Sequence, residues 1–248
     1  MLVKDIVEIM EKYFPLSKQE EWDKCGLQIG DLNQEVKKIM IGLNADQQTL
    51  LEAIDQDCDM LITHHPFLLD PIENIDSSHF MGQFIYSAIK NDVAIYSSHT
   101  AMDHVLMNHW LIEMLDVEDI QVGDDSGISR IARLKEPMTQ NDFIQHIKDV
   151  YQLDHFKYAG NKELISVVAL IGGSGADFLP HFYNKADAFI TGDSKYRHAK
   201  NAVDHDILLV DVNHHIENIM VKRLKELLEK EVNIEIVEAS SKDYYHYI

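Results

Sequence analysis

The chain has 248 residues, of which 46% are hydrophobic and 26% charged, and its formal net charge is −20. This length and composition are typical of a globular protein with one large domain or two lobes. The acidic balance argues against general nucleic-acid binding, because phosphate contacts need Lys and Arg. The two cysteines, Cys25 and Cys58, lack CxxC spacing and therefore indicate neither a disulfide framework nor a thiolate zinc site.

The N-terminal segment predicts an amphipathic helix rather than a signal peptide. Its apolar residues from Val3 to Phe14 follow helical spacing. The segment also carries acidic residues and lacks a small-residue cleavage site. No run in the chain approaches the roughly 18 apolar residues of a membrane span. With both cysteines expected to be reduced, we expect a cytoplasmic protein that does not contact membranes.

Strand-like and helix-like segments alternate in the first half of the chain. We expect strands at 37–45, 59–65 and 93–99, with helices at 46–57 and 79–92. This alternation favours a parallel sheet with right-handed crossovers. In such sheets the working residues gather beyond the carboxyl ends of the strands. The residues that fall at this edge are His64, His65 and His99.

The second half repeats the plan, with strands expected at 163–175, 187–193 and 205–215 and helices at 176–186 and 216–230. IGLNAD (41–46) echoes IGGSGAD (171–177), and CDMLITHHP (58–66) echoes ADAFITGDS (186–194). These echoes suggest an internal duplication. We therefore predict an α/β fold with two similar, interlocked lobes, 1–125 and 126–248, in which the C-terminal helix and strand can pack back on the first lobe.

Three clusters of histidine and carboxylate occur where predicted strands end. His64 and His65 precede Pro66, which restricts His65 to an extended or turn conformation. In the other two clusters, Asp103 lies four residues after His99, and Glu217 lies three residues after His214. Both spacings bring two side chains together on one side of a helix. Each cluster alone also fits a structural role, but together they point to a divalent-metal site, and a bridging carboxylate would allow two metals. The five candidate ligands are His64, His65, Asp103, His214 and Glu217.

Weaker signals receive a structural interpretation or stay open. IGGSGAD lacks the Walker pattern and is interpreted as a packing turn. The segment 191–200 gathers four basic side chains, which either hold an anionic substrate or form a solvated helix face: Lys195, Arg197, His198 and Lys200. Five further histidines have no informative spacing and are interpreted as structural: His104, His109, His155, His181 and His205.

Five blocks of the sequence resemble, in order, the signature blocks of the GTP cyclohydrolase I type 2 homologues, also described as Ngg-interacting-factor-3-like. They are WDKCGLQIGD (22–31), LITHHPF (61–67), SSHTAMD (97–103), ADAFITGDSKYRHA (186–199) and DVNHHIE (211–217). The resemblance covers nearly the whole chain and is to the form without the inserted domain. The chain departs from the family pattern at Lys24–Cys25 and at Asn213, and the role of His215 stays open.

The resemblance implies a two-lobed α/β protein with two adjacent divalent metals in the cleft between the lobes. Carried over by position, the ligands would be the five named above, with Glu217 as a bridge, and His99 would act beside them as a proton carrier or hydrogen-bonding partner. The resemblance also implies a homohexameric, toroidal assembly with the metal sites facing an inner cavity. His, Asp and Glu ligands accept Zn, Fe, Mn or Ni, so the metal stays undetermined.

These observations lead to the hypothesis of a dinuclear metal-dependent hydrolase acting on a small anionic substrate. The most specific version is GTP cyclohydrolase-like, with a metal-activated water opening the guanine imidazole ring, formate leaving and His99 shuttling protons. One alternative is a metal-dependent phosphoesterase or other nucleotide hydrolase that uses the same residues. The other is a non-catalytic metal-binding ring that docks a partner protein.

Overall fold

The computed structural model describes residues 1–240 and 242–246, and the chain folds as two compact units. The first unit is Met1–Val105 with Asn218–Tyr244, and the second is Leu106–Glu217 with the end of the chain. The unit boundary therefore lies before the predicted 125/126 boundary, because the strand at Val117–Val122 pairs within the second sheet. Positions 241, 247 and 248 of the predicted 126–248 lobe lie outside the described residues.

The first unit contains a five-stranded sheet in the order β1-β4-β3-β2-β11, in which only β1 runs antiparallel to its neighbour. The three predicted strands are present as β2, β3 and β4, each buried along nearly its whole length. A parallel sheet covered on both faces requires such continuous apolar runs. The strands are β1 (Gly26–Ile29), β2 (Lys38–Asn44), β3 (Met60–His65), β4 (Ala94–Ser97) and β11 (Glu235–Glu238).

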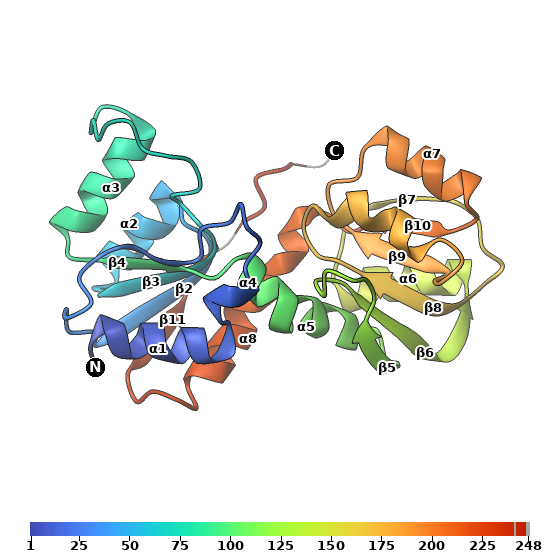
Figure 1. The fold of residues 1–248 in the computed structure, drawn as a ribbon, viewed down its shortest axis with the longest axis horizontal. Coiled ribbons are helices and arrows are strands. Elements are labelled where there is room, and N and C mark those ends of the chain that lie inside the picture. The colour runs from blue at the N-terminus through green and yellow to red at the C-terminus, as the bar shows by residue number, and fades with distance from the viewer. Residues whose placement is uncertain (241, 247–248) are drawn as a thin grey trace. The chain divides into compact units, whose positions relative to one another are not determined.

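Helices cover both faces of this sheet, with α2 and α3 on one face and α1 and α8 on the other (Figure 1). The predicted helix at 216–230 becomes α8 and contacts β2 and β11, so it belongs to the first unit. The helices are α1 (Val3–Tyr13), the 3-10 turn η1 (Leu16–Lys18), α2 (Gln47–Asp55), α3 (Phe80–Lys90), α4 (Thr100–Met102) and α8 (Ile219–Leu228).

The second unit contains a six-stranded sheet in the order β5-β6-β8-β9-β10-β7. Its parallel centre, β8-β9-β10, corresponds to the three predicted strands, whereas the antiparallel β5, β6 and β7 were not predicted. The strands are β5 (Val117–Val122), β6 (Arg130–Thr139), β7 (Lys157–Ala159), β8 (Leu164–Leu170), β9 (Ala188–Thr191) and β10 (Leu208–Asp211).

The helices of the second unit pack on different strands of this sheet: α5 and α6 contact β6 and β8, and α7 contacts β7 and β10. The α-helix predicted at 176–186 is instead a 3-10 segment, in which Pro180 cannot donate the backbone hydrogen bond that an α-helix needs. The helices are α5 (Asn108–Glu113), α6 (Gln140–Val150), η3 (Gly175–Phe182), α7 (Tyr196–Asp204) and η4 (His214–Asn218).

Four strands have the same arrangement in both sheets. In the first sheet the order β1-β4-β3-β2 places an antiparallel strand beside the last of three parallel strands, and β7-β10-β9-β8 does the same in the second. The equivalent strands β4 and β10 are each followed by a histidine, His99 and His214. Both histidines therefore lie beyond the carboxyl ends of parallel strands, where α/β proteins form sites.

Candidate metal centre

Three imidazole rings meet at the carboxyl edge of the first sheet. His64 and His65 end β3, and His99 follows the neighbouring β4. The ring centroids are 4.9 Å apart for His64 and His65, 5.1 Å for His64 and His99, and 5.5 Å for His65 and His99. One ligand nitrogen from each ring lies within 4.8 Å of the other two. The structure thus brings together the pair and the third histidine that the sequence singled out.

Each of these rings is held by a hydrogen bond from Nδ1 to an oxygen. The distance is 3.0 Å from His64 to the Ser98 carbonyl, 2.6 Å from His65 to Asn44 Oδ1 and 3.0 Å from His99 to Asp23 Oδ1. These oxygens only accept hydrogen bonds, so Nδ1 of each ring is the donor. Metal-binding histidines usually make an outer hydrogen bond of this kind.

Asp103 approaches this cluster from the helix that begins after His99. That helix starts at Thr100 and passes into a π-helical turn at Asp103–Met107. Such wide turns recur at functional sites. His64 Nε2 and Asp103 Oδ1 are 3.5 Å apart, and both side chains are largely buried. A carboxylate and three imidazoles in the same buried region form a donor set that suits a divalent metal.

Asp23 contacts the candidate site, and the sequence reasoning missed it. Its fully buried carboxylate accepts hydrogen bonds from the His99 ring and from the backbone N–H and hydroxyl of Thr100. Burial alone would raise the pKa of Asp23, but the hydrogen bond and charge of His99 and the Thr100 bonds lower that pKa well below its usual value. The signal was the WD pair in the block at 22–31, which had no assigned role.

The second unit positions His214 and Glu217 in the short 3-10 segment η4. His214 Nε2 lies 3.1 Å from Glu217 Oε2, so the predicted i, i+3 pair is formed. Its Nδ1 lies 2.6 Å from Asp193 Oδ2. The hydrogen bond to Glu217 outweighs burial and, with the Asp193 contact, raises the pKa of His214 to about 9. A metal bound by His214 Nε2 would have to displace the proton that Glu217 stabilises.

The carboxylate of Glu217 depends on a glycine that was interpreted only as part of a packing turn. Gly173 has a φ of +56°, and a Cβ there would lie 2.4 Å from Glu217 Oε1. Two turn residues around His214 also adopt left-handed backbone: Asp193 with a φ of 51° and Asn213 with a φ of 67°. Asn213, one of the departures from the family pattern, thus adopts left-handed backbone directly before His214. The glycine-rich segment after β8 therefore makes room for the Glu217 carboxylate.

The basic residues of the segment 191–200 divide into paired and unpaired groups. Arg197 and His198 both bond to Asp177, and Lys200 pairs with Asp204. Lys195 has no ion-pair partner within residues 1–240 and 242–246. Among the remaining histidines, His104 Nε2 bonds to Glu20 at 2.9 Å, which agrees with its structural interpretation.

Two cavities lie in the second unit, and one of them is lined by His214. The larger has a volume of about 650 Å³ and is lined by residues that include His214, Asp193, Lys157, Ser194 and Asp211. The last three of these residues also line a second cavity, so the two are neighbours. Across the described part of the chain, no helix combines the length and apolar character needed to cross a membrane.

Comparison with known families gives one consistent result. The model of the family described as Duf34/NIF3 (NGG1p interacting factor 3) matches residues 1–243. The chain is 32% identical to the GTP cyclohydrolase 1 type 2 homolog of Streptococcus pneumoniae, over 99% of this chain and 100% of that one. It is 30% identical to the protein of the same name from Clostridium perfringens, over the full length of both.

Solved structures have the same fold. A Staphylococcus aureus protein superposes with a TM-score of 0.91 at 24% identity, covering 100% of this chain and 99% of that one. Reduced HcgD from Methanocaldococcus jannaschii superposes with a TM-score of 0.88 at 28% identity, covering 97% of this chain and 98% of that one. The mixed α/β fold with two sheets is therefore shared with proteins of this group.

Proposed function

The chain belongs to the Duf34/NIF3 family, and on that premise we propose that it is a divalent-metal-dependent hydrolase. The observation that carries the proposal is the state of four imidazoles, at positions 64, 65, 99 and 214. Each bonds through Nδ1 to an oxygen acceptor. Metal-binding histidines usually make such an outer hydrogen bond, which fixes the orientation of the ring.

The proposed function uses two metals. Their proposed ligands are His64, His65 and Asp103 in one donor set, and His214 with the bridging carboxylate Glu217 in the other. Supporting this assignment, Asp103 and Glu217 are both buried, and divalent metals would offset the cost of burying their negative charge. Divalent metals at such a site would lower the pKa of a water and stabilise an anionic transition state.

The residues around the metals have separate roles in the proposed reaction. Asp23 holds the His99 ring in one orientation, so that its Nε2 can accept and return a proton. Gly173 allows the Glu217 carboxylate to lie against the backbone. The cavity beside His214 admits a small substrate. The specific reaction is GTP cyclohydrolase-like: a water opens the guanine imidazole ring, and formate leaves. Its support is the name of the Streptococcus and Clostridium relatives.

We further infer that the two halves arose by duplication, on the basis of the strand order shared by the sheets. A toroidal homohexamer and a cytoplasmic location complete the proposal. Exposed apolar side chains on α3, including Phe80 and Ile89, support an interface between copies of the chain. The two free cysteines, Cys25 and Cys58, support a reducing compartment. Light scattering after size exclusion tests the assembly, and a monomer in solution would refute it.

Metal stoichiometry tests the site itself. We expect His64→Ala and His214→Ala each to lose about one metal per chain while the folded circular dichroism spectrum is retained. His181→Ala, at an exposed position of η3, is the matched control and keeps the full stoichiometry. Unchanged metal content in both site variants would refute the assignment.

Product analysis tests the reaction. The protein, loaded separately with Mn, Fe or Zn, is incubated with GTP and with a phosphoester panel, and products are identified by mass. Formate and a ring-opened or pterin triphosphate product support the proposal. Release of phosphate or pyrophosphate instead identifies a phosphoesterase. No turnover at full metal occupancy indicates the non-catalytic alternative.

A further inference from the structure

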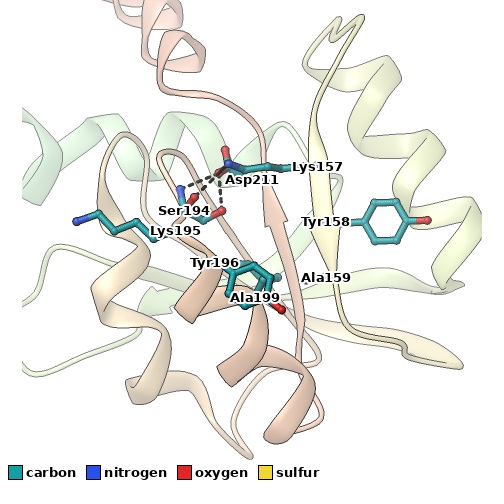
Figure 2. Close-up of a pocket in the computed structure, with 9 residues that line it drawn as sticks. Lys157, Tyr158, Ala159, Ser194, Lys195, Tyr196, Ala199 and Asp211 are labelled. Carbon is teal, nitrogen blue, oxygen red and sulfur yellow. Dashed lines mark hydrogen bonds and ion pairs between the residues drawn. The ribbon is translucent and has the colours of Figure 1, made fainter.

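A small cavity lies between β7 and the first turn of α7 in the second unit (Figure 2). We call it the β7–α7 pocket. Its volume is about 270 Å³, close to the lower end of the sizes that bind small molecules. Most of its lining is apolar and comes from Ala159, Ala199, Leu209 and the ring of Tyr196. None of these residues belongs to the proposed metal centre.

The β7–α7 pocket adjoins the cavity that contains His214. Lys157, Ser194 and Asp211 line both spaces. A substrate whose reacting group lies beside His214 can therefore extend past these three residues and place its remaining part in the pocket. The inference made here rests on the proposed function, because that function places the reacting group beside His214.

The charged groups at the boundary between the two cavities are paired with each other. Asp211 Oδ2 accepts hydrogen bonds from the Ser194 backbone at 2.7 Å and its hydroxyl at 2.6 Å, and Lys157 Nζ lies 3.1 Å away. Figure 2 shows these three residues joined in one network. The charge of Lys157 is consequently matched by Asp211, and neither residue offers a free charge to a ligand.

Lys195 differs from the other cations near the pocket. It lines the pocket, is exposed, and lies apart from the Asp211 network in Figure 2. In the described part of the chain its ammonium group has no ion-pair partner, whereas Arg197 and Lys200 on the same helix are paired with Asp177 and Asp204. In a chain with a net charge of −20, one available cation suits one anionic group rather than a chain of phosphates.

We propose that the β7–α7 pocket binds the sugar and first phosphate of a purine nucleotide, with the sugar against Tyr196 and the phosphate on Lys195. The base then lies beside His214. Phosphates beyond the first extend into solvent and contribute little. The site thus recognises a nucleoside monophosphate unit, and it makes no distinction between mono- and triphosphates in binding.

Calorimetry on the metal-loaded protein tests the proposal with guanosine, GMP and GTP as probes. We expect GMP to bind at least about tenfold more tightly than guanosine, as one charge-assisted contact provides, and GTP to bind within about threefold of GMP. Lys195→Ala removes the advantage of GMP and leaves guanosine binding unchanged. Lys200→Ala, five residues further along the chain and outside the pocket lining, is the control and retains the advantage.

A second pair of variants tests the apolar part of the pocket. Ala199→Leu fills the space and is expected to weaken guanosine and GMP alike by about tenfold, whereas Val203→Leu, one turn further along α7, changes neither. Thermal melting checks that all four variants fold. The proposal is overturned if the wild type binds no GMP, if guanosine and GMP bind equally, if Lys200→Ala acts like Lys195→Ala, or if Ala199→Leu binds normally.

The outcome is separable from that of the proposed function, because binding needs no turnover. A protein that binds GMP through Lys195 and Ala199 but hydrolyses no nucleotide refutes the hydrolase proposal and retains this pocket. A protein that opens the guanine ring with a KM that neither Lys195→Ala nor Ala199→Leu changes supports the hydrolase proposal and refutes this pocket.

Discussion

His99 and His214 follow equivalent strands in the two sheets and bond to a carboxylate through the same nitrogen, yet the carboxylates differ. Asp23 comes from the loop before β1 and its side chain is fully buried, whereas Asp193 comes from the turn after β9 and its side chain is 40% exposed. The same ring orientation is thus achieved by a core residue in one unit and by a surface residue in the other. The two strand ends therefore share the ring nitrogen that bonds to a carboxylate, although the partner residue differs in its burial.

Removing the two carboxylates should lower the free energy of unfolding by unequal amounts. Asp23→Ala leaves the buried Thr100 N–H and the His99 ring without their acceptor, and should lower the free energy of unfolding by about 3–5 kcal/mol. Asp193→Ala removes a solvent-screened contact and should cost at most about 1 kcal/mol. Urea denaturation of the metal-free variants measures both. Equal losses would show that burial does not distinguish the two partners.

Gly173→Ala should disable the second donor set while leaving the first intact. The left-handed backbone costs roughly 1–2 kcal/mol for a residue with a Cβ, and the added carbon would displace the Glu217 carboxylate. We expect the metal content to fall by about one ion per chain in elemental analysis. Gly127→Ala carries a similar backbone penalty at a φ of 88°, in a turn before β6, and should keep its metal. Metal retention in Gly173→Ala would contradict the role of that glycine.

Metal affinity should depend on pH through His214. Its pKa is raised to about 9 from 6.5, so the protonated ring stabilises the metal-free fold fully below pH 6.5, and this stabilisation is lost as the pH rises through 9. A metal must displace that proton, so the apparent Kd for Mn²⁺ should fall by about tenfold per pH unit between about 6 and 9. Titrations at four pH values measure it. In His214→Gln this part of the slope should disappear.

The smallest expected effect concerns Cys25, which belongs to the loop of Asp23. Burial raises the pKa of Cys25 to about 12 and that of Cys58 to about 11. Because only the thiolate reacts, alkylation by iodoacetamide at pH 8 should be at least about 100-fold slower than in the urea-unfolded chain. Mass spectrometry follows the labelling. Rapid modification of Cys25 would indicate that the loop carrying Asp23 opens frequently.

The parallel strands and their terminal histidines were predictable from the sequence. Strands such as β2 and β3 are buried on both faces, so their apolar runs are continuous and easily recognised. The antiparallel strands β5 and β6 were not predictable in the same way. Most of their residues are exposed or half-buried, and their register shifts interrupt the pairing, so no regular period appears in the sequence.

The partners of the histidines were the least predictable part of the site. Asn44 reaches His65 because β2 and β3 pair in a register that places the two residues side by side. Asp23 reaches His99 across a separation of 76 residues. Neither contact leaves a local pattern, because each depends on strand order and loop path. The ligand candidates were found because they are themselves the chemically distinctive residues at strand ends.

The sequence by itself determined the parallel strands, the positions of His64, His65, His99 and His214, and the family, because hydrophobic periodicity and motif order are local properties. The tertiary structure was needed to show which oxygen each ring nitrogen contacts, which glycine makes room for Glu217, and that Lys195 has no ion-pair partner among the described residues. These properties depend on atoms that are far apart along the chain and are brought within hydrogen-bonding distance only when the sheets form.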